Sequence, residues 1–398
     1  MRVPLLDLSE QYRLLAEPIR HEIDEILRTQ GFILGPKVEE FEQALAAYCG
    51  VRHAIGVSSG TDALLDILMA LGLGPNDAVI TTAYTFFATA GCIARVGATP
   101  VFVDIDPATF NISPTALANF LENECRRNEK GELVDLGGRI VKAIVPVHLF
   151  GLCCEMDLIN DLAARFKLMV IEDAAQAIGA EYPSKEGARQ AGTMSAAGSL
   201  SFYPSKNLGA AGDAGAILCH DDDLARRFRS FRQHGMEPRY IHHVVGGNFR
   251  LDAIQAAVLK VKLPYLNDWS AARQQVADIY HAEFSASGLT ETLTLPAEPY
   301  RHRGLTNHHI YHQYVVRTPR RDALQKHLTE RGIGSAIYYP LGLHEQECFA
   351  SLGYRAGDLP ETERAAKETL ALPIYPELTR ERQREVVAEI AEFLSRVS

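Results

Sequence analysis

Residues 51–84, VRHAIGVSSGTDALLDILMALGLGPNDAVITTAY, decide the fold class of this chain. They run from a short apolar segment through a small polar turn into an apolar stretch of helical length, and they end in a second short apolar segment. The two short segments are apolar without strict alternation, which is typical of strands buried on both faces of a sheet. A strand, a helix and a second strand in this order predict a right-handed βαβ unit with parallel strands.

The same alternation of strand and helix patterns continues to about residue 219. Further strand-like segments with apolar residues lie at 99–106, 139–151, 168–175 and 198–205, with helical patterns between most of them. Repeated βαβ units predict a mostly parallel sheet between two helix layers, which is a three-layer α/β/α domain. Residues 125–138, CRRNEKGELVDLGG, interrupt the pattern with charge and glycine and predict an exposed loop.

The C-terminal third of the chain follows a different pattern. A helical segment over 251–284 contains Pro264, which has no N–H group and predicts a kink or a break. A strand pattern at 309–317, HIYHQYVVR, and two more helices follow. We therefore expect a large α/β domain over residues 1–260, including an N-terminal arm, and a smaller α+β domain over residues 261–398.

The composition excludes several classes of protein. The 398 residues are 47% hydrophobic and 23% charged, as in soluble globular chains. The net charge of −10 argues against binding to nucleic acid or to an anionic membrane surface. No apolar run reaches the roughly 18 residues that cross a bilayer, and the N terminus lacks the apolar segment of a signal peptide. Seven scattered cysteines match neither a disulfide framework nor a metal motif, so we expect reduced thiols, a cytoplasmic location and no bound metal.

Two groups of histidines need a separate interpretation. His308 and His312 have helical spacing, but their segment has the pattern of a strand, which would not bring them together as a metal-binding pair. His148 follows a predicted strand, and we expect it to line a ligand cavity rather than to act in catalysis.

Polar groups mark the carboxyl ends of three predicted strands, and open parallel sheets bind ligands beyond these ends. The first group is Ser58–Asp62, SSGTD, which lies between a strand and a helix. Free N–H groups at a helix N terminus attract an anion, and a glycine lets a phosphate approach the backbone. The same residues would also serve as an ordinary helix cap.

The second group is Glu172–Gln176, EDAAQ, at the end of the strand pattern LMVI. A carboxylate at the mouth of a buried sheet needs a cation or several donors, because burying it alone costs several kcal/mol. A protonated heterocyclic nitrogen would satisfy Asp173, and Gln176 lies one helical turn further on, where it could face the same cavity. Asp173 would equally serve as the cap of a following helix.

The third group is Ser201–Asn207, SFYPSKN, in which Lys206 precedes a glycine-rich turn. Desolvation lowers the pKa of an amine and makes it a nucleophile toward an aldehyde, although most lysines simply lie at the surface. Together the three groups match the needs of pyridoxal phosphate: a helix N terminus for the phosphate, Asp173 for the ring nitrogen and Lys206 for the aldehyde. Asp173 would keep the ring nitrogen protonated, and Lys206 would move a substrate proton.

Motifs along the whole chain match one known family. They include FILGPKVEEFE, SSGTDALLDIL, AYTFFATA, ATPVFVDID, VPVHLFG, IEDAAQAIGA, SLSFYPSKNLGAAGDAG, GGNFRLDAIQAA and YYPLGLHEQECF. The match extends from LDLSEQY (6–12) to LPIYPELT (372–379). The chain therefore resembles the DegT/DnrJ/EryC1/StrS family of sugar-nucleotide aminotransferases, which have the aspartate aminotransferase fold, also called fold type I.

The resemblance implies roles for individual residues. Lys206 would condense with the cofactor aldehyde, Asp173 would pair with the pyridine nitrogen, and Gln176 would bond the ring hydroxyl. The remaining cofactor contacts would be the backbone amides of Gly60 and Thr61, the Ser201 hydroxyl on the phosphate, the Phe86 ring on the pyridine face, and Asn248 from the neighbouring subunit. Tyr339 and His344 match positions near the sugar nucleotide.

The implied activity is the transfer of an amino group to a keto carbon of a nucleotide-linked deoxysugar, with L-glutamate as the expected donor. SFYPSKN has Tyr203 where other relatives carry histidine, and it resembles branches that act on 3-keto sugars, so we favour C3 over C4. The resemblance also implies a homodimer with shared active sites. The sequence does not identify the nucleotide, dTDP or UDP, or the pathway.

Two other functions stay open at this point. The first is a pyridoxal-phosphate-dependent sugar dehydratase, but the dehydrating branch carries histidine where this chain has Lys206. The second is a non-catalytic sugar-nucleotide sensor or transcription regulator. The net charge of −10 and the lack of a recognisable helix-turn-helix pattern argue against that role.

Overall fold

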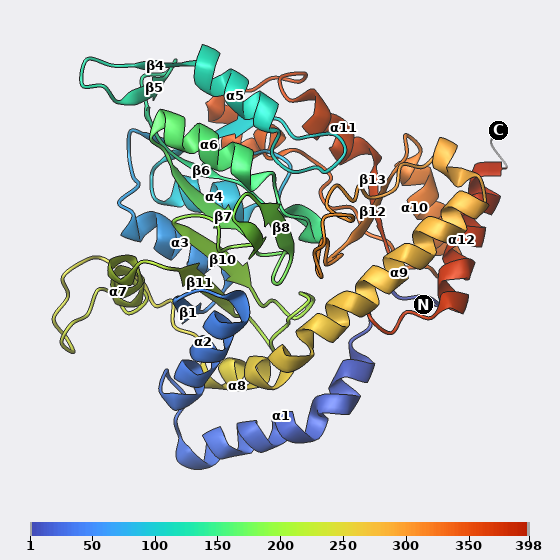
Figure 1. Cartoon of the computed structure of the whole chain (residues 1–398), viewed down its shortest axis with the longest axis horizontal. Helices are drawn as coiled ribbons and strands as arrows, with labels where there is room; N and C mark the ends of the chain where they lie inside the picture. The colour runs from blue at the N-terminus through green and yellow to red at the C-terminus, as the bar shows by residue number, and fades with distance from the viewer. Residues whose placement is uncertain (1, 396–398) are drawn as a thin grey trace.

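A nine-stranded sheet forms the centre of the computed structural model, which describes residues 2–395 (Figure 1). Its strands are β1 (His53–Val57), β2 (Asp77–Thr82), β3 (Thr99–Val103), β4 (Cys125–Arg127), β5 (Leu133–Asp135), β6 (Ile140–Val145), β7 (Met169–Asp173), β10 (Ala197–Ser201) and β11 (Gly215–Cys219). The main path runs β1-β11-β10-β7-β6-β2-β3. From β3 to β10 all neighbours on this path are parallel, and β11 pairs antiparallel with β10 and β1. The predicted mostly parallel sheet is confirmed.

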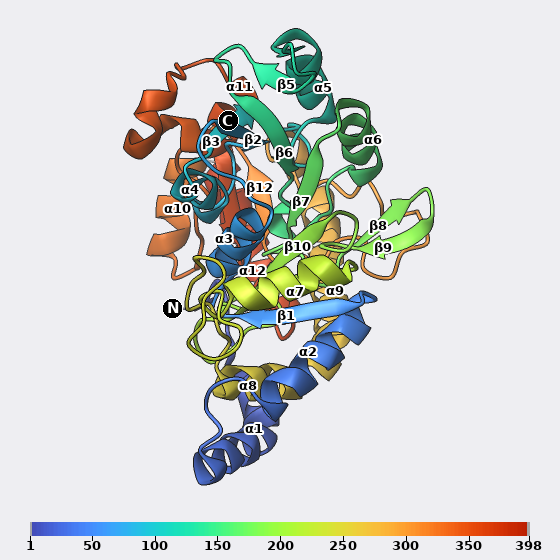
Figure 2. The same cartoon turned by 90° about the vertical axis from the view of Figure 1, so that its left-hand side faces the viewer.

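Helices cover both faces of the sheet. One hydrophobic core lies against α2 (Pro36–Cys49), α5 (Pro114–Asn123), α6 (Met156–Phe166) and α8 (Ala253–Lys262), and the other lies against α3 (Gly60–Ala70), α4 (Ala88–Arg95) and α7 (Asp222–Phe231). Successive residues of β2 alternate between the two cores: Ala78 and Ile80 face the first, and Val79 faces the second. Figure 2 shows α7 beside β1, with α2 and α8 below. The large domain therefore has the predicted three layers.

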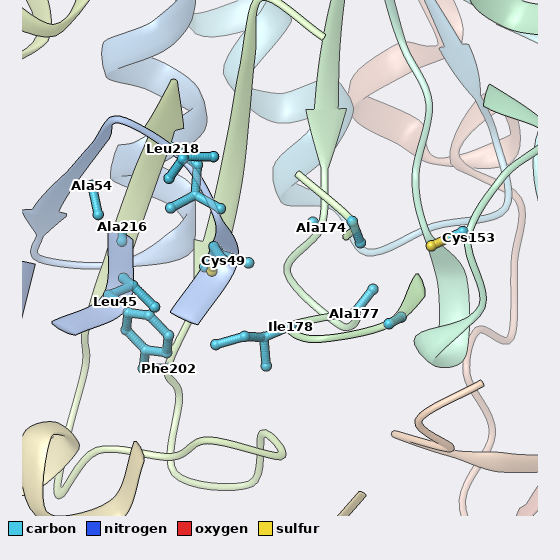
Figure 3. Close-up of a cluster of buried hydrophobic side chains, with 14 of the residues drawn as sticks. Leu45, Cys49, Ala54, Cys153, Ala174, Ala177, Ile178, Phe202, Ala216 and Leu218 are labelled. Atoms are coloured by element: carbon cyan, nitrogen blue, oxygen red, sulfur yellow. The ribbon is translucent and has the colours of Figure 1, made fainter. Parts of the chain in front are cut away.

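The core on the α2 face fixes the chain just before the predicted nucleophile. Figure 3 shows Phe202 close to Leu45 of α2, with Ala216 of β11 nearby. Phe202 is fully buried, and its ring meets the ring of Phe41 edge to face at 5.6 Å. Because Phe202 lies four residues before Lys206, this packing holds the start of the turn that carries the lysine.

The segment 125–138 is a β-hairpin and not the exposed loop that the sequence predicts. Strand β4 pairs antiparallel with β5, and Val134 of β5 pairs with Ile140 of β6. Leu133 and Val134 are buried, so two apolar residues among charged neighbours are enough to attach the hairpin to the sheet. A second hairpin, β8 (Glu181–Ser184) with β9 (Gly187–Gln190), lies outside the main sheet.

The C-terminal part combines helices with a small antiparallel sheet. Its elements are α9 (Leu266–Ala286), β12 (Tyr314–Arg317), α10 (Arg321–Glu330), α11 (Pro360–Glu368), β13 (Thr369–Leu372) and α12 (Arg380–Ser395). Pro264 lies in a 3-10 turn that separates α8 from α9, as its sequence position predicts. The predicted strand over 309–317 is only partly right, because β12 begins at Tyr314.

Helix α9 joins the two parts of the chain, as its diagonal course in Figure 1 shows. Trp269, near its start, packs in the large core, whereas Val276 and Phe284 pack in the C-terminal core. Val3 also packs in the C-terminal core, and α1 (Ser9–Thr29) lies along α8. The N-terminal segment thus contacts both parts, and the boundary near residue 260 stays a prediction. Over residues 2–395, no helix is both long and apolar enough to span a bilayer.

Replacing Gly198 by alanine is expected to destabilise the central sheet. A Cβ atom at this position in β10 would lie 2.3 Å from the carbonyl oxygen of Gly192, so backbone must move to admit it. We expect a loss of about 1–3 kcal/mol in the free energy of unfolding, measured by urea denaturation. The control is Gly31→Ala, whose Cβ would meet only a Thr29 oxygen at 3.7 Å. A Gly198→Ala protein as stable as this control would contradict the prediction.

Candidate active site

A cavity of about 550 Å³ opens at the carboxyl ends of β1, β2, β7 and β10, where the sequence predicted a ligand site. Its volume lies within the usual range for small-molecule sites, about 300–1,000 Å³. The cavity brings together most of the predicted residues: Gly60, Thr61, Phe86, Asp173, Gln176, Ser201, Lys206 and Tyr339. Tyr203, Tyr338 and His312 also line it.

The N terminus of α3 forms one end of the cavity. The Ser59 hydroxyl accepts a hydrogen bond from the Asp62 N–H at 3.0 Å, and the Ser59 carbonyl accepts one from Ala63 at 2.9 Å. Within residues 2–395 the N–H groups of Gly60 and Thr61 have no such partner, so they remain available to an anion. Gly60 is required because a Cβ atom there would lie 2.7 Å from the Ser201 Cβ. The interpretation as a helix cap is confirmed, and the anion site stays a prediction that these two N–H groups can serve.

Asp173 is the last residue of β7, and its side chain is buried at the base of the cavity. One carboxylate oxygen accepts a hydrogen bond from the Thr89 hydroxyl at 2.8 Å, and the other accepts one from the Ala175 N–H at 3.2 Å. Burial raises the pKa of Asp173, while these two hydrogen bonds and the charge of Lys206 oppose the rise. Two donors only partly compensate the buried charge, so the site favours a cationic ligand group beside the carboxylate.

Lys206 faces the same cavity from the turn that follows β10. Burial lowers the pKa of its amine from 10.5 to about 8, and the Asp173 carboxylate counteracts part of this effect. Asn207 anchors the turn, because its amide donates to the Ile310 carbonyl at 2.9 Å and its oxygen lies 3.2 Å from His312 Nδ1. The fraction of the amine that is neutral and nucleophilic near neutral pH is therefore far larger than for an ordinary lysine.

Gln176 occupies the side of the cavity between Asp173 and the C-terminal part of the chain. Its Oε1 accepts a hydrogen bond from the Phe150 N–H at 2.8 Å, and its Nε2 donates to the Tyr339 hydroxyl at 3.1 Å. One hydrogen of Nε2 remains for a ligand hydroxyl. The Phe86 ring is exposed and lies 6.2 Å from the Tyr339 ring, so the two aromatic side chains form an apolar wall.

Three residues that the sequence placed at or near the site lie outside the cavity lining. Asn248 is exposed on the segment between α7 and α8, so its predicted contact with a neighbouring subunit stays a prediction. His344 is buried, with its Nε2 3.5 Å from Glu363, and its role near the sugar nucleotide also stays a prediction. The expectation that His148 lines the cavity is wrong. His148 is fully buried, and its Nε2 lies 2.9 Å from Glu172.

The geometry of His148 shows why it lies behind the site. Its Nδ1 accepts a hydrogen bond from the Cys154 N–H at 3.0 Å, which requires an unprotonated Nδ1 and a proton on Nε2 that Glu172 accepts. Glu172 also accepts from the N–H groups of Gly192 and Met194, both at 2.7 Å, so its buried carboxylate is fully compensated. Because successive strand residues point to opposite faces, Glu172 faces this network while Asp173 faces the cavity.

The sequence did not single out Thr89, which donates directly to Asp173. The only available signal was its position in AYTFFATA, three residues after Phe86 and therefore on the same side of a helical turn. The 84 residues that separate Thr89 from Asp173 hide this contact from any local pattern.

Among the described residues, one group of side chains has metal-ligand spacing: Asp278, His281 and Glu298. Arg301 lies 2.6 Å from both Asp278 and Glu298 and already supplies positive charge between them. His308 lies 3.3 Å from Glu298, whereas His312 lines the cavity, so these two histidines do not converge.

The residues of the cavity fit pyridoxal phosphate. The partly compensated carboxylate of Asp173 suits a protonated ring nitrogen, the free N–H groups at α3 suit a phosphate, and the Lys206 amine suits an aldehyde. Gln176 retains a donor for the ring hydroxyl. These groups belong to one cavity, which can accommodate all of their partners in a single molecule.

Comparisons with known proteins agree with this chemistry. Residues 14–391 match the model of the DegT/DnrJ/EryC1/StrS aminotransferase family. The chain is 49% identical to the pleiotropic regulatory protein of Geobacillus stearothermophilus, with 99% of each chain covered. It is 38% identical to the UDP-2-acetamido-2-deoxy-3-oxo-D-glucuronate aminotransferase of Pseudomonas aeruginosa, covering 94% of this chain and 96% of that protein.

Two further comparisons involve Streptomyces venezuelae. The dTDP-3-amino-3,4,6-trideoxy-alpha-D-glucose transaminase of this organism is 36% identical, with 100% of this chain and 97% of the relative covered. The crystal structure of S. venezuelae DesV in complex with a ketimine intermediate superimposes with a TM-score of 0.89 at 36% identity, and the match covers 100% of both chains.

Modification of Lys206 in the cofactor-free protein is expected to depend on pH with a midpoint near pH 8. Above this pH the amine is neutral and reacts with a small aldehyde, and the adduct is trapped by cyanoborohydride and measured by mass spectrometry. Asp173→Asn removes a charge that favours the ammonium form, so the midpoint should move to lower pH. A midpoint above pH 10, or a shift upward in Asp173→Asn, would contradict the electrostatic description of the site.

Proposed function

Since the chain belongs to the DegT/DnrJ/EryC1/StrS aminotransferase family and is thus an aminotransferase that uses pyridoxal phosphate, we propose that it moves an amino group from L-glutamate to a keto carbon of a nucleotide-linked deoxysugar. The observation that carries the proposal is the single cavity that joins Lys206, Asp173 and the free N terminus of α3. We favour C3 as the aminated carbon, because the names of two relatives specify a 3-oxo or a 3-amino sugar.

Each residue of the cavity has a distinct task in this reaction. When bound, the cofactor supplies an electron sink that stabilises negative charge at the reacting carbon. Asp173 holds a proton on the ring nitrogen, and Thr89 and Ala175 orient its carboxylate. The Lys206 amine, with a pKa of about 8, takes up and returns the proton at the reacting carbon. The Phe86 and Tyr339 rings form one side of the cavity against which a ligand can pack.

The two other functions are less well supported. A dehydratase of this family would carry histidine at the position of Lys206, and here that position supplies an amine of lowered pKa. The Geobacillus relative carries the name of a regulatory protein. A purely regulatory role would not explain why the Lys206 amine and the buried Asp173 carboxylate line the same cavity.

We also propose that the active unit is a homodimer whose sites are shared. Lys206 and His312 are the only basic side chains among the described residues that line the cavity, and burial keeps the pKa of His312 well below its usual value. Glutamate and a nucleotide diphosphate both need positive charge, which a neighbouring subunit would supply. The segment with Asn248 exposes several large apolar side chains, with Tyr240 74% and Val245 89% accessible, as in surfaces that bind a partner.

Transfer of nitrogen from donor to sugar tests the reaction. The protein is incubated with ¹⁵N-labelled L-glutamate and a panel of dTDP- and UDP-linked 3-keto and 4-keto sugars, and the product is examined by mass spectrometry and NMR. We expect ¹⁵N at C3 of one sugar and none with Lys206→Ala, which lacks the amine that binds cofactor and moves the proton. Lys130→Ala, a change of an exposed lysine, should keep full activity. Amination at the native rate by Lys206→Ala, or loss of oxygen without gain of nitrogen, would contradict the proposal.

Mixed dimers test the sharing of active sites. Lys206→Ala and Asn248→Ala proteins are each expected to be nearly inactive, because every site of either homodimer lacks one group. A hybrid dimer holds one site with Lys206 from one chain and Asn248 from the other. Random exchange at a 1:1 ratio should therefore restore about a quarter of the wild-type activity. Absence of any recovery after verified subunit exchange would show that Asn248 acts within its own chain, and full activity of Asn248→Ala alone would show that Asn248 has no role in the site.

A further inference from the structure

We propose that Tyr84 is a positioning residue of this active site, whose hydroxyl group holds the loop over residues 338–343 against the cavity and so keeps Tyr339 beside Gln176. Tyr338 and Tyr339 line the cavity, whereas Tyr84 does not. The inference rests on the proposed function, because it assigns this loop to the side of the cavity that receives the sugar nucleotide.

Two consecutive residues at the exit of β2 anchor both ends of the loop. The Tyr84 hydroxyl donates to the Tyr338 carbonyl at 2.7 Å. The Leu343 N–H donates to the carbonyl of Ala83 at 2.8 Å. Because β2 pairs with a strand on each side and is buried along its whole length, these anchors connect the loop to the main sheet.

The hydroxyl protons around Tyr84 can be assigned from the available acceptors. The Thr369 hydroxyl oxygen lies 2.6 Å from the Tyr84 oxygen. A carbonyl can only accept, so the Tyr84 proton is directed to the Tyr338 carbonyl. The Thr369 hydroxyl has two acceptors within reach, the Tyr84 oxygen and the Ala365 carbonyl at 2.8 Å, which also accepts the Thr369 backbone N–H. Donation from Thr369 to Tyr84 leaves the Tyr84 proton for the Tyr338 carbonyl, and each of these two hydrogen bonds then strengthens the other.

Aromatic packing gives the Tyr84 hydroxyl one well-defined position. Tyr84 is fully buried, and its ring centroid lies 6.0 Å from that of Phe110 and 6.4 Å from that of Phe150. The Tyr339 ring packs against the same cluster at 6.3 Å from Tyr84. A phenylalanine would retain this packing, so Tyr84→Phe removes the hydrogen bond and little else.

If the loop moved, Tyr339 would move with it and would change the contacts of Gln176 and Phe86 in the cavity. The Tyr339 hydroxyl accepts the hydrogen bond from Gln176 Nε2, and its ring forms the wall with Phe86. Gln176 is held from its other side by the Phe150 N–H, and the two hydrogen bonds that orient Asp173 come from Thr89 and Ala175, which lie outside the loop. Loss of the Tyr84 hydroxyl should therefore weaken the binding of the acceptor sugar and leave the reaction with the amino donor nearly unchanged.

The test compares Tyr84→Phe with a matched control, Tyr354→Phe. The Tyr354 hydroxyl also ties a C-terminal segment to the sheet, because it accepts from the Phe102 N–H at 2.8 Å and donates to the Phe102 carbonyl at 3.2 Å. Tyr354 does not line the cavity. We expect Tyr84→Phe to raise the KM of the acceptor sugar about five- to tenfold, with kcat and the rate of the donor half-reaction within about twofold of wild type. Tyr354→Phe should leave all three unchanged.

A second measurement needs no sugar substrate. Hydrogen–deuterium exchange of peptides that cover residues 336–343 should be faster in Tyr84→Phe than in wild type and in Tyr354→Phe, with cofactor bound. Unchanged exchange in Tyr84→Phe, or an equal rise in acceptor KM in both variants, would overturn the inference. If the wild-type protein aminates no sugar nucleotide, the proposed function fails, and the exchange comparison alone then decides whether Tyr84 holds the loop.

Discussion

The active site depends on the burial of one carboxylate, that of Asp173, which the protein compensates only in part. Two hydrogen bonds, from Thr89 and from the Ala175 N–H, fix its direction. The remaining compensation has to come from a positive charge in the cavity, and Lys206 or a protonated ring nitrogen can supply it. The same low-polarity environment lowers the pKa of the Lys206 amine, so one physical condition prepares both groups for their tasks.

The sheet explains why these groups meet. The carboxyl ends of β1, β7 and β10 lie at the same end of the sheet. The antiparallel strand β11 lies between β10 and β1 and runs in the opposite direction. A Cβ atom at Gly215, the first residue of β11, would lie 2.4 Å from the Ser59 carbonyl carbon, so β11 passes directly under the start of α3. This close packing brings the free N–H groups at the start of α3 next to Ser201.

A second set of contacts keeps Asp173 in place from behind. Glu172, the preceding residue, accepts hydrogen bonds from His148 and from two backbone N–H groups, and all of these groups are buried or nearly so. In addition, the backbone N–H of His148 donates to the backbone carbonyl of Asp173 at 3.0 Å. The Asp173 carboxylate is therefore carried by a backbone segment that is held in place by hydrogen bonds to the neighbouring Glu172 side chain and to the Asp173 carbonyl.

The sequence by itself determined the layers of the fold and the three strand ends, and it predicted that Asp173, Gln176 and Lys206 face one cavity, because strand and helix periodicity and strand-end chemistry are local properties of the chain. Only the tertiary structure decided that Thr89 orients Asp173, that His148 faces Glu172 rather than the cavity, and that residues 125–138 pair with the sheet. Each of these outcomes depends on a contact between segments distant in sequence or on burial that charged neighbours conceal. The link between Tyr84 and Tyr338 spans 254 positions and has no local signal, since its energy arises only when packing brings the two segments together.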